Sequence, residues 1–217
     1  MRARVTLVSL IVLATLCISQ TALGQELSPI RLPPPDTEGG MPLMKALSAR
    51  QTSRAFLPDS LPVQTLSDLL WAAFGVNRPE SGKRTAPSAV NWQDADIYVF
   101  MERGAFLYDA PRHELEPVRS GDLRALTGSQ PFVRDAPITL VLVSDLSRIT
   151  DQSQEQKDFY SAIDAGFISQ NVYLYCASEG LATGVRALID RPALKEALGL
   201  RDDQRIIVAQ SVGRPGG

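Results

Sequence analysis

The sequence predicts a layered domain of strands and helices, of the α+β or α/β class. Residues 138–143 form a continuous apolar run, which is typical of a strand buried on both faces. Residues 153–179 have the length and pattern of one long helix, which Gly180 would end. Because strands and helices are interleaved along the chain, we expect a sheet covered by helices.

The N-terminal half begins with an extended arm and continues with two helices. Residues 25–40 are rich in Pro and Gly, so no regular element is expected there. A helix is predicted over residues 41–50, with Pro42 in its first turn. A second helix starts near Pro62 and ends at Gly75. Its apolar face carries Leu66, Leu69, Leu70, Ala73 and Phe74.

The C-terminal half contributes most of the strands. Residues 82–91 are predicted to form a loop around Pro87. Residues 97–101 and 105–108 are expected to pair as a hairpin. Residues 190–198 predict a short helix capped by Asp190, and residues 206–212 predict the last strand.

The first 24 residues predict an export signal rather than part of the domain. Arg2 and Arg4 precede an apolar run over residues 5–18, and Ala22-Leu23-Gly24 is a small-x-small cleavage site. The run is short for a bilayer span, so we predict cleavage before Gln25, with an uncleaved anchor as the alternative. The mature domain would then cover residues 41–217 behind the arm, in the periplasm or outside the cell, without a stable membrane span.

Composition excludes several classes of function. Loss of the signal removes two arginines and no acidic residue, so the net charge falls from −2 to about −4, which argues against broad nucleic-acid binding. The mature chain retains one cysteine, Cys176, and one histidine, His113. Neither an internal disulfide nor a zinc site built from several Cys and His ligands is expected. A protein nucleophile is improbable as well, so an enzyme of this composition would take its reactivity from a cofactor.

One short basic run is a candidate binding site. In Arg50-Gln51-Thr52-Ser53-Arg54, alternate side chains leave an extended segment on one face. Two guanidiniums and a hydroxyl on that face can hold a phosphate through charge-assisted hydrogen bonds. The alternative is a solvated basic turn without a ligand.

The predicted long helix carries small residues at three- and four-residue spacing, namely Ala162, Ala165, Gly166 and Ser169. Such a stripe lets a second helix approach closely. The spacing leaves open whether that helix belongs to the same subunit or to the partner in a dimer.

Three separated segments together resemble the nitroreductase superfamily of FMN-dependent oxidoreductases. Residues 50–56 are similar to its R-x-S-x-R/K-x-F motif, with Thr52 in place of Ser, and residues 87–93 resemble its P-S-x-x-N-x-Q loop. Residues 164–183 and 198–215 resemble its central helix, its G-L-G/A-T turn and its closing strand. Residues 69–75 and 84–89 look most like the branch that contains the SagB-type oxidases.

The resemblance implies an α+β fold with a central mixed, mainly antiparallel sheet flanked by helices. It also implies an obligate homodimer around the long helix, with FMN bound between two subunits. The implied FMN contacts are Arg50, Thr52 and Arg54 at the phosphate, Pro87 and Ser88 at the flavin ring, Asn91 at the pyrimidine edge or ribityl chain, and Ala187 and Leu188 near N5.

The implied activity is hydride transfer through flavin N5 in a ping-pong cycle. The acceptor would be a small electron-poor compound such as a quinone or nitroaromatic. No catalytic side chain and no metal are required. The alternative is a flavin- or ligand-binding protein without turnover, because a fold does not fix a function.

Overall fold

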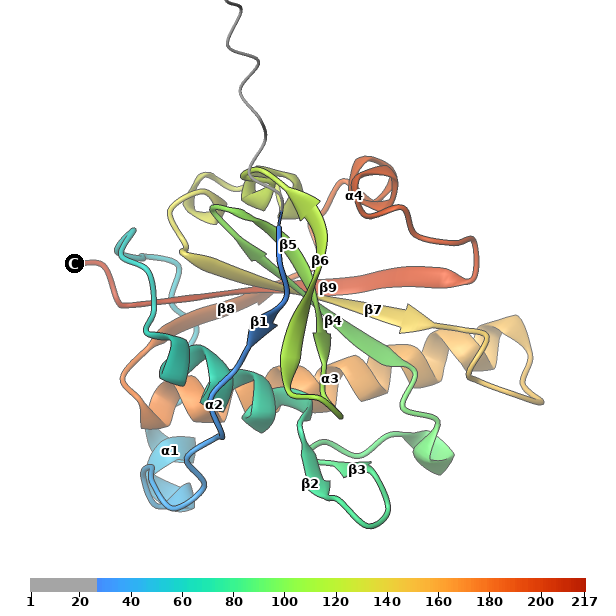
Figure 1. The fold of residues 1–217 in the computed structure, drawn as a ribbon, viewed down its shortest axis with the longest axis horizontal. Helices are drawn as coiled ribbons and strands as arrows, with labels where there is room; N and C mark the ends of the chain where they lie inside the picture. The colour runs from blue at the N-terminus through green and yellow to red at the C-terminus, as the bar shows by residue number, and fades with distance from the viewer. Residues whose placement is uncertain (1–26) are drawn as a thin grey trace, which may run out of the picture.

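The computed structural model describes residues 27–217, and the predicted export signal lies outside them. Seven strands form one sheet in the order β1-β6-β5-β4-β7-β9-β8 (Figure 1). We expected a mixed, mainly antiparallel sheet. In the structure, every pair of neighbouring strands in this sheet is antiparallel. The strands are β1 Ile30–Arg31, β4 Ala95–Met101, β5 Gly104–Asp109, β6 Glu114–Ser120, β7 Ile138–Asp145, β8 Ala182–Arg186 and β9 Gln204–Gly213, while β2 Val76–Arg78 and β3 Lys83–Arg84 pair separately.

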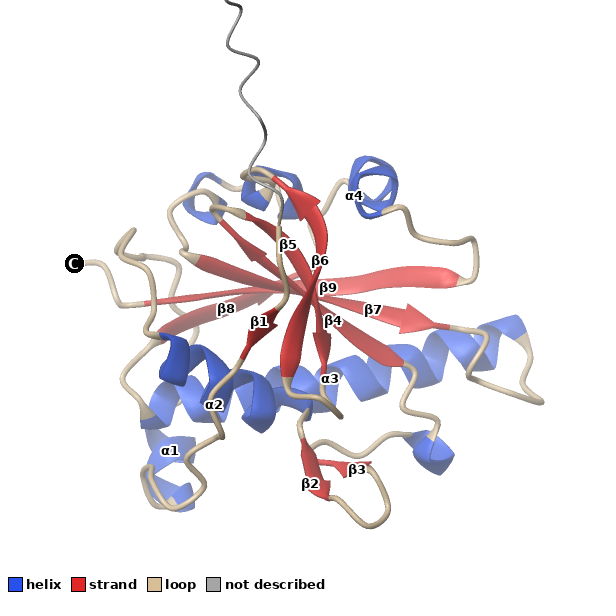
Figure 2. Ribbon diagram, viewed as in Figure 1, coloured by secondary structure: helices blue, strands red, loops and turns tan. Residues whose placement is uncertain are grey.

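Four α-helices of the described chain lie on the two sides of the sheet (Figure 2). Ser153 caps the long helix through a reciprocal capping box with Gln156, and Asp190 accepts a hydrogen bond from the Ala193 amide at the start of the last helix. The predicted helices are therefore confirmed, with their ends within two residues of the expected positions. They are α1 Leu43–Ala49, α2 Val63–Phe74, α3 Gln154–Ser178 and α4 Arg191–Leu198, with single 3-10 turns η1 Ala89–Asn91, η2 Arg124–Thr127 and η3 Pro131–Val133.

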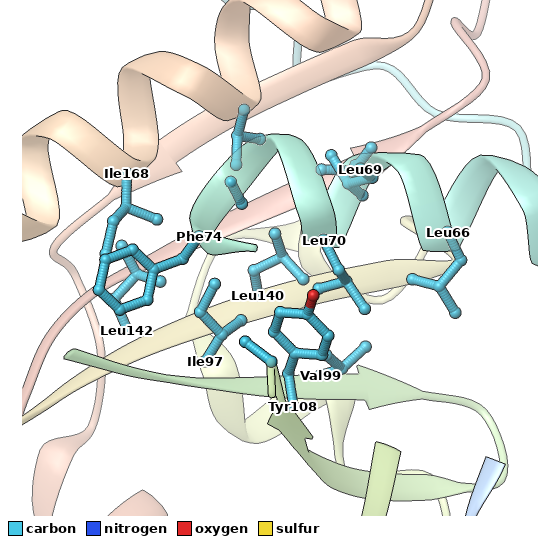
Figure 3. Packing of buried hydrophobic residues seen from close by; sticks show 14 of the residues in the cluster. Leu66, Leu69, Leu70, Phe74, Ile97, Val99, Tyr108, Leu140, Leu142 and Ile168 are labelled. Atoms are coloured by element: carbon cyan, nitrogen blue, oxygen red, sulfur yellow. The ribbon is translucent and has the colours of Figure 1, made fainter. Parts of the chain in front are cut away.

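The sheet is buried on both faces. Ile97 and Val99 of β4 lie in the core that α2 and α3 cover, whereas Tyr98 and Phe100 lie in the core that α4 covers. This alternation is the two-residue period of a strand. All residues of β7 are buried, as its continuous apolar run predicted. Figure 3 shows the α2 side of the core, where Leu66, Leu69, Leu70 and Phe74 meet Ile97, Val99, Tyr108, Leu140, Leu142 and Ile168.

Three strands of the sheet were not predicted from the sequence. β6 carries Glu114, Glu116 and Pro117, so its pattern is that of a polar segment rather than a strand. β8 contains Gly184 and follows directly after the end of α3, and β1 has two residues only. Pairing with β5, β9 and β6 decides these strands, because their own side chains carry little strand preference.

The small residues of α3 do not form one buried stripe. Ala165 and Ser169 are buried against the sheet, whereas Ala162 and Gly166 are exposed. Exposed apolar side chains continue this outer face at a spacing of four residues, namely Phe159 with 61% of its surface exposed, Ile163 and Phe167. α1, which packs against α3, exposes Leu43, Met44 and Leu47. Among the described helices, none has the length and apolar character to cross a membrane.

Candidate functional site

The Arg50–Arg54 segment follows α1 in an extended conformation and lies beside β8, the edge strand of the sheet. The Ser53 amide donates to the Thr183 carbonyl of β8 at 2.9 Å, and the Gly216 amide donates to the Ala55 carbonyl at 2.9 Å. Phe56 forms an isolated antiparallel bridge with Pro215. The C-terminal residues and β8 therefore fix the backbone of this segment from two sides.

Tyr173 of α3 organises the side chains of the segment. The Arg50 guanidinium lies over its ring, 5.3 Å from the centroid. The Tyr173 hydroxyl accepts a hydrogen bond from the Val185 amide at 3.0 Å and lies 3.0 Å from Thr52 Oγ1. When Tyr173 donates its own proton to Thr52, the Thr52 proton is free for an external acceptor.

The two guanidiniums of the segment carry uncompensated charge. Neither Arg50 nor Arg54 forms an ion pair with a carboxylate of residues 27–217. Arg54 lies close to β8, since its Cγ is 3.6 Å from the position that a Cβ would take at Gly184. Together with the Thr52 hydroxyl, they form a donor set suited to a dianionic phosphate.

Gly184 allows this close approach. A Cβ at this position would lie 3.1 Å from the Ser53 carbonyl oxygen, which is tighter than an ordinary contact. A larger residue would therefore push the Arg50–Arg54 segment away from β8.

The Pro87–Asn91 loop is the second candidate region, and its backbone is strained. Val90, Asn91 and Gln93 all adopt positive φ values, of 48°, 60° and 48°. For the β-branched Val90 this is a genuine outlier. The Ser88 hydroxyl accepts from the Gln93 amide at 2.9 Å, so the loop closes on itself.

Asp164 of α3 anchors this loop. The Ala89 amide donates to both carboxyl oxygens, at 3.2 and 3.1 Å. Asp164 is 1% exposed. Burial, and next a hydrogen bond with the Asp94 side chain, raise the pKa of Asp164 to about 7.

Ala187 and Leu188 follow directly after β8 and are exposed. Arg191 Nη1 donates to the Ala187 carbonyl at 3.2 Å, which ties this turn to the start of α4. The backbone of the turn therefore lies open beyond the strand that supports Thr52 and Arg54.

One chain does not bring the predicted contacts together. The basic segment is anchored at Tyr173 and the loop at Asp164, nine residues apart on α3, which corresponds to about 14 Å along the helix. In Figure 1, α1 lies near the C-terminal end of α3, whereas the loop that follows β3 lies farther along α3 toward its N-terminal end. The candidate contacts therefore lie in two groups, which we call half-sites: Arg50, Thr52 and Arg54 lie at Tyr173, and Pro87, Ser88 and Asn91 lie at Asp164. Ala187 and Leu188 lie beyond the C-terminal end of β8, the strand whose first residues contact the basic segment.

The sequence analysis missed three residues that organise these half-sites, namely Tyr173, Asp164 and Asp94. Asp164 had one usable signal, because it is a carboxylate on the inner face of a helix among apolar residues. Nothing in the sequence relates Tyr173 to Thr52, which lies 121 residues away.

Comparisons with known proteins agree with this geometry. Residues 47–214 match the model of the Nitroreductase family. A Methanocaldococcus jannaschii protein assigned as a nitroreductase is 31% identical over 179 residues, covering 77% of this chain and 89% of that protein. A crystal structure of a Ralstonia eutropha JMP134 protein, also assigned as a nitroreductase, is 43% identical with a TM-score of 0.83 and covers 87% of this chain and 90% of that one.

More distant structures share the fold alone. The NADPH:FMN oxidoreductase of Vibrio harveyi, in complex with NAD+, is 19% identical with a TM-score of 0.60 and covers 81% of this chain and 69% of that one. A structure of the Escherichia coli microcin synthetase McbBCD is 18% identical with a TM-score of 0.67 and covers 98% of this chain and 85% of that one.

Proposed function

The chain belongs to the nitroreductase family, and from this premise we propose that it is an exported FMN-dependent oxidoreductase. The supporting observation is the donor set at the Tyr173 end of α3. Two guanidiniums without a carboxylate partner among residues 27–217 lie there beside the Thr52 hydroxyl, which can donate to a ligand when Tyr173 donates to it.

The residues present fit FMN in charge and in chemistry. Arg50, Arg54 and Thr52 supply donors for its phosphate, and the Pro87–Asn91 loop presents a proline ring, a hydroxyl and an amide for the isoalloxazine. When bound, FMN would supply the redox chemistry, in which a hydride from a donor is received in one half-reaction and passed to a small electron-poor acceptor in the other. The chain itself would hold, orient and shield the flavin, since the reaction needs no nucleophile or general acid from a side chain.

A complete site requires two copies of the chain. The midpoint between Asp164 and Tyr173 lies close to Phe167, within the exposed apolar face of Phe159, Ile163 and Phe167. A two-fold pairing of α3 helices about this point brings the Asp164 end of one chain to the Tyr173 end of the other. Each half-site then meets the complementary half-site of the partner, and the apolar face is covered.

The physiological acceptor is proposed by class only, as a quinone, a nitroaromatic or a related flat electron-poor compound. Within the family, the segments 69–75 and 84–89 support a position near the SagB-type branch. Export is supported by the pattern of residues 1–24, and N-terminal sequencing of the protein recovered from a producing cell would test cleavage before Gln25.

The visible absorption spectrum of the protein from Gln25 onward, taken after addition of excess FMN and desalting, tests the proposal. A retained flavin band stoichiometric with the chain is expected. Bleaching by a reductant and recovery on addition of a quinone would then support turnover. A retained band that no acceptor restores would favour the non-catalytic binding protein, and folded protein without retained flavin would overturn the cofactor assignment.

A further inference from the structure

Two buried carboxyl groups meet beneath the Pro87–Asn91 loop. Asp94 is fully buried at the end of this loop, and Asp164 is 1% exposed on α3. A hydrogen bond with the Asp94 side chain is among the causes that raise the pKa of Asp164, so the two carboxyl groups lie next to each other. A hydrogen bond between two carboxyl groups needs a proton on one of them, because ionised carboxylates are acceptors only.

The other contacts of the pair leave a place for this proton. The Ser144 hydroxyl donates to Asp94 Oδ2 at 2.5 Å, and the Ala89 amide donates to Asp164. Asp94 Oδ1 is buried without a donor among the N–H and O–H groups of the described chain. Neither carboxyl forms an ion pair with a described cation. A proton on Asp164 therefore satisfies Asp94 Oδ1, and no nearby cation would compensate two negative charges.

The pair also closes the loop at both of its ends. Ala89, at the start of the turn, is held by Asp164, while Asp94, at its end, is held by Asp164 and by Ser144 of β7. The three left-handed residues lie between these two anchors. Such strained conformations persist only where the surrounding contacts enforce them.

We propose that Asp94 and Asp164 share one proton and act as a positioning pair that holds the 87–93 loop in its flavin-binding conformation, so that loss of this proton releases the loop. This inference deepens the proposed function and rests on it for the role of the loop. Without the proton, two like charges at hydrogen-bonding distance repel in a buried site, and the closure between β7 and α3 opens.

Other charged groups nearby are already engaged. Asp96 has a pKa raised by burial, but it remains within an ion pair. The charged groups on the packed elements and their partners are Asp96 with Arg148, Asp145 with Arg148 and Arg201, Arg84 with Gln93 Oε1, and Lys157 with the Leu146 carbonyl.

Trp92 offers a readout of the loop that does not depend on FMN. Its ring packs edge-on against Tyr160 of α3, with centroids 5.4 Å apart. In a Trp71→Phe background, Trp92 is the remaining tryptophan, and its emission is expected to change as pH rises through about 7, following the raised pKa of Asp164.

Asp164→Asn mimics the protonated pair. Its amide N–H can donate to Asp94 Oδ1, while its amide oxygen still accepts from Ala89. The variant should keep the loop closed at all pH values, so its Trp92 emission should not titrate. Asp158→Asn, a partly exposed carboxyl on the same helix that pairs with Arg205, should titrate like the parent protein. Identical titration of Asp164→Asn and the parent would overturn the proposal, and Asp94→Asn provides the same test if Asp164→Asn does not fold.

FMN binding separates this inference from the proposed function. The affinity of the parent protein should fall by up to tenfold per pH unit above the midpoint, as required by linkage to one proton, whereas that of Asp164→Asn should stay constant. If Trp92 titrates as expected but FMN binds at no pH, the pair is supported and the cofactor proposal fails. If FMN binds with the same pH dependence in both proteins, the cofactor proposal stands and the positioning pair is wrong.

Discussion

Near Tyr173 of α3, the candidate site consists of two arginine guanidiniums without ion-pair partners in the described chain, on a backbone without strained φ values. At Asp164, near the middle of α3, it is built from a strained backbone over buried acids. The first region leaves Arg50 and Arg54 without carboxylate partners in the described part of the chain, so their charge is available to a ligand. The second region encloses its charges and presents loop backbone and small polar groups instead. A phosphate is held by charge and a flavin ring by shape, and the two half-sites differ accordingly.

The largest effect is expected from removing the charge of the first region. Arg50→Ala combined with Arg54→Ala should weaken FMN binding by roughly 10²–10⁴-fold, since each hydrogen bond to a charged group contributes about 1.5–3 kcal/mol. Equilibrium dialysis with FMN measures this. The matched control is Arg112→Ala with Arg134→Ala, which removes the same charge from exposed positions elsewhere. Equal binding by both double variants would show that the basic segment is a solvated turn.

The second-largest effect is expected from disrupting the proposed α3–α3 contact between two chains, which brings the two regions together. A Cβ at Gly166 would meet nothing within 4 Å in the same chain, and Leu has a better helix propensity than Gly by about 0.8 kcal/mol. Gly166→Leu should therefore not destabilise the chain by itself, but it should weaken a dimer that packs on this face by about 1–3 kcal/mol.

Sedimentation velocity over a range of protein concentrations reports this change, and flavin retention should fall in parallel. Glu196→Leu, on an exposed position of α4 across the sheet, is the control. An unchanged oligomeric state in Gly166→Leu would remove the outer face of α3 from the interface.

A smaller effect is expected from changing Tyr173, which supports the first region without contributing to its charge. Tyr173→Phe keeps the ring beneath Arg50 but removes the hydroxyl that orients Thr52. FMN affinity should fall about fivefold to tenfold, the value of one neutral hydrogen bond. Tyr160→Phe removes a hydroxyl from the same helix that has no hydrogen bond with a described residue. Were Tyr160→Phe to lose as much affinity, the role given to the Tyr173 hydroxyl would be wrong.

The smallest expected effect is a change in the pH dependence of the free energy of unfolding, and it arises from the second region. The pKa of Asp164 is raised in the folded state, so the folded protein binds more protons than the unfolded chain between about pH 4 and 7. The free energy of unfolding should therefore fall as pH rises through this window, and Asp164→Asn should remove that slope.

His113 changes the free energy of unfolding with pH in the opposite direction, so its contribution must be separated from that of Asp164. Burial lowers its pKa, so its contribution is lost as pH falls below about 6.5. Urea denaturation in a His113→Gln background isolates the Asp164 slope. A slope that persists in the Asp164→Asn, His113→Gln protein would assign it to another group.

The sequence was sufficient for the helices and for the strands with strong patterns. Ser153, Asp190, Gly75 and Gly199 mark helix ends by local chemistry, and the apolar run of β7 identifies a buried strand. The same local information predicted the Arg50–Arg54 segment as extended. It failed for β6 and β8, whose strand state depends on their neighbours.

For the candidate site, the sequence determined the donors but not their supports. Arg50, Thr52 and Arg54 are contiguous, so their charge and spacing can be read from the chain. Tyr173 lies 121 residues from Thr52 and Asp164 lies 75 residues from Ala89, so folding alone brings them to the basic segment and the loop. Local propensity and composition are properties of neighbouring residues, whereas burial, shared protons and the division into two half-sites arise only when distant segments pack together.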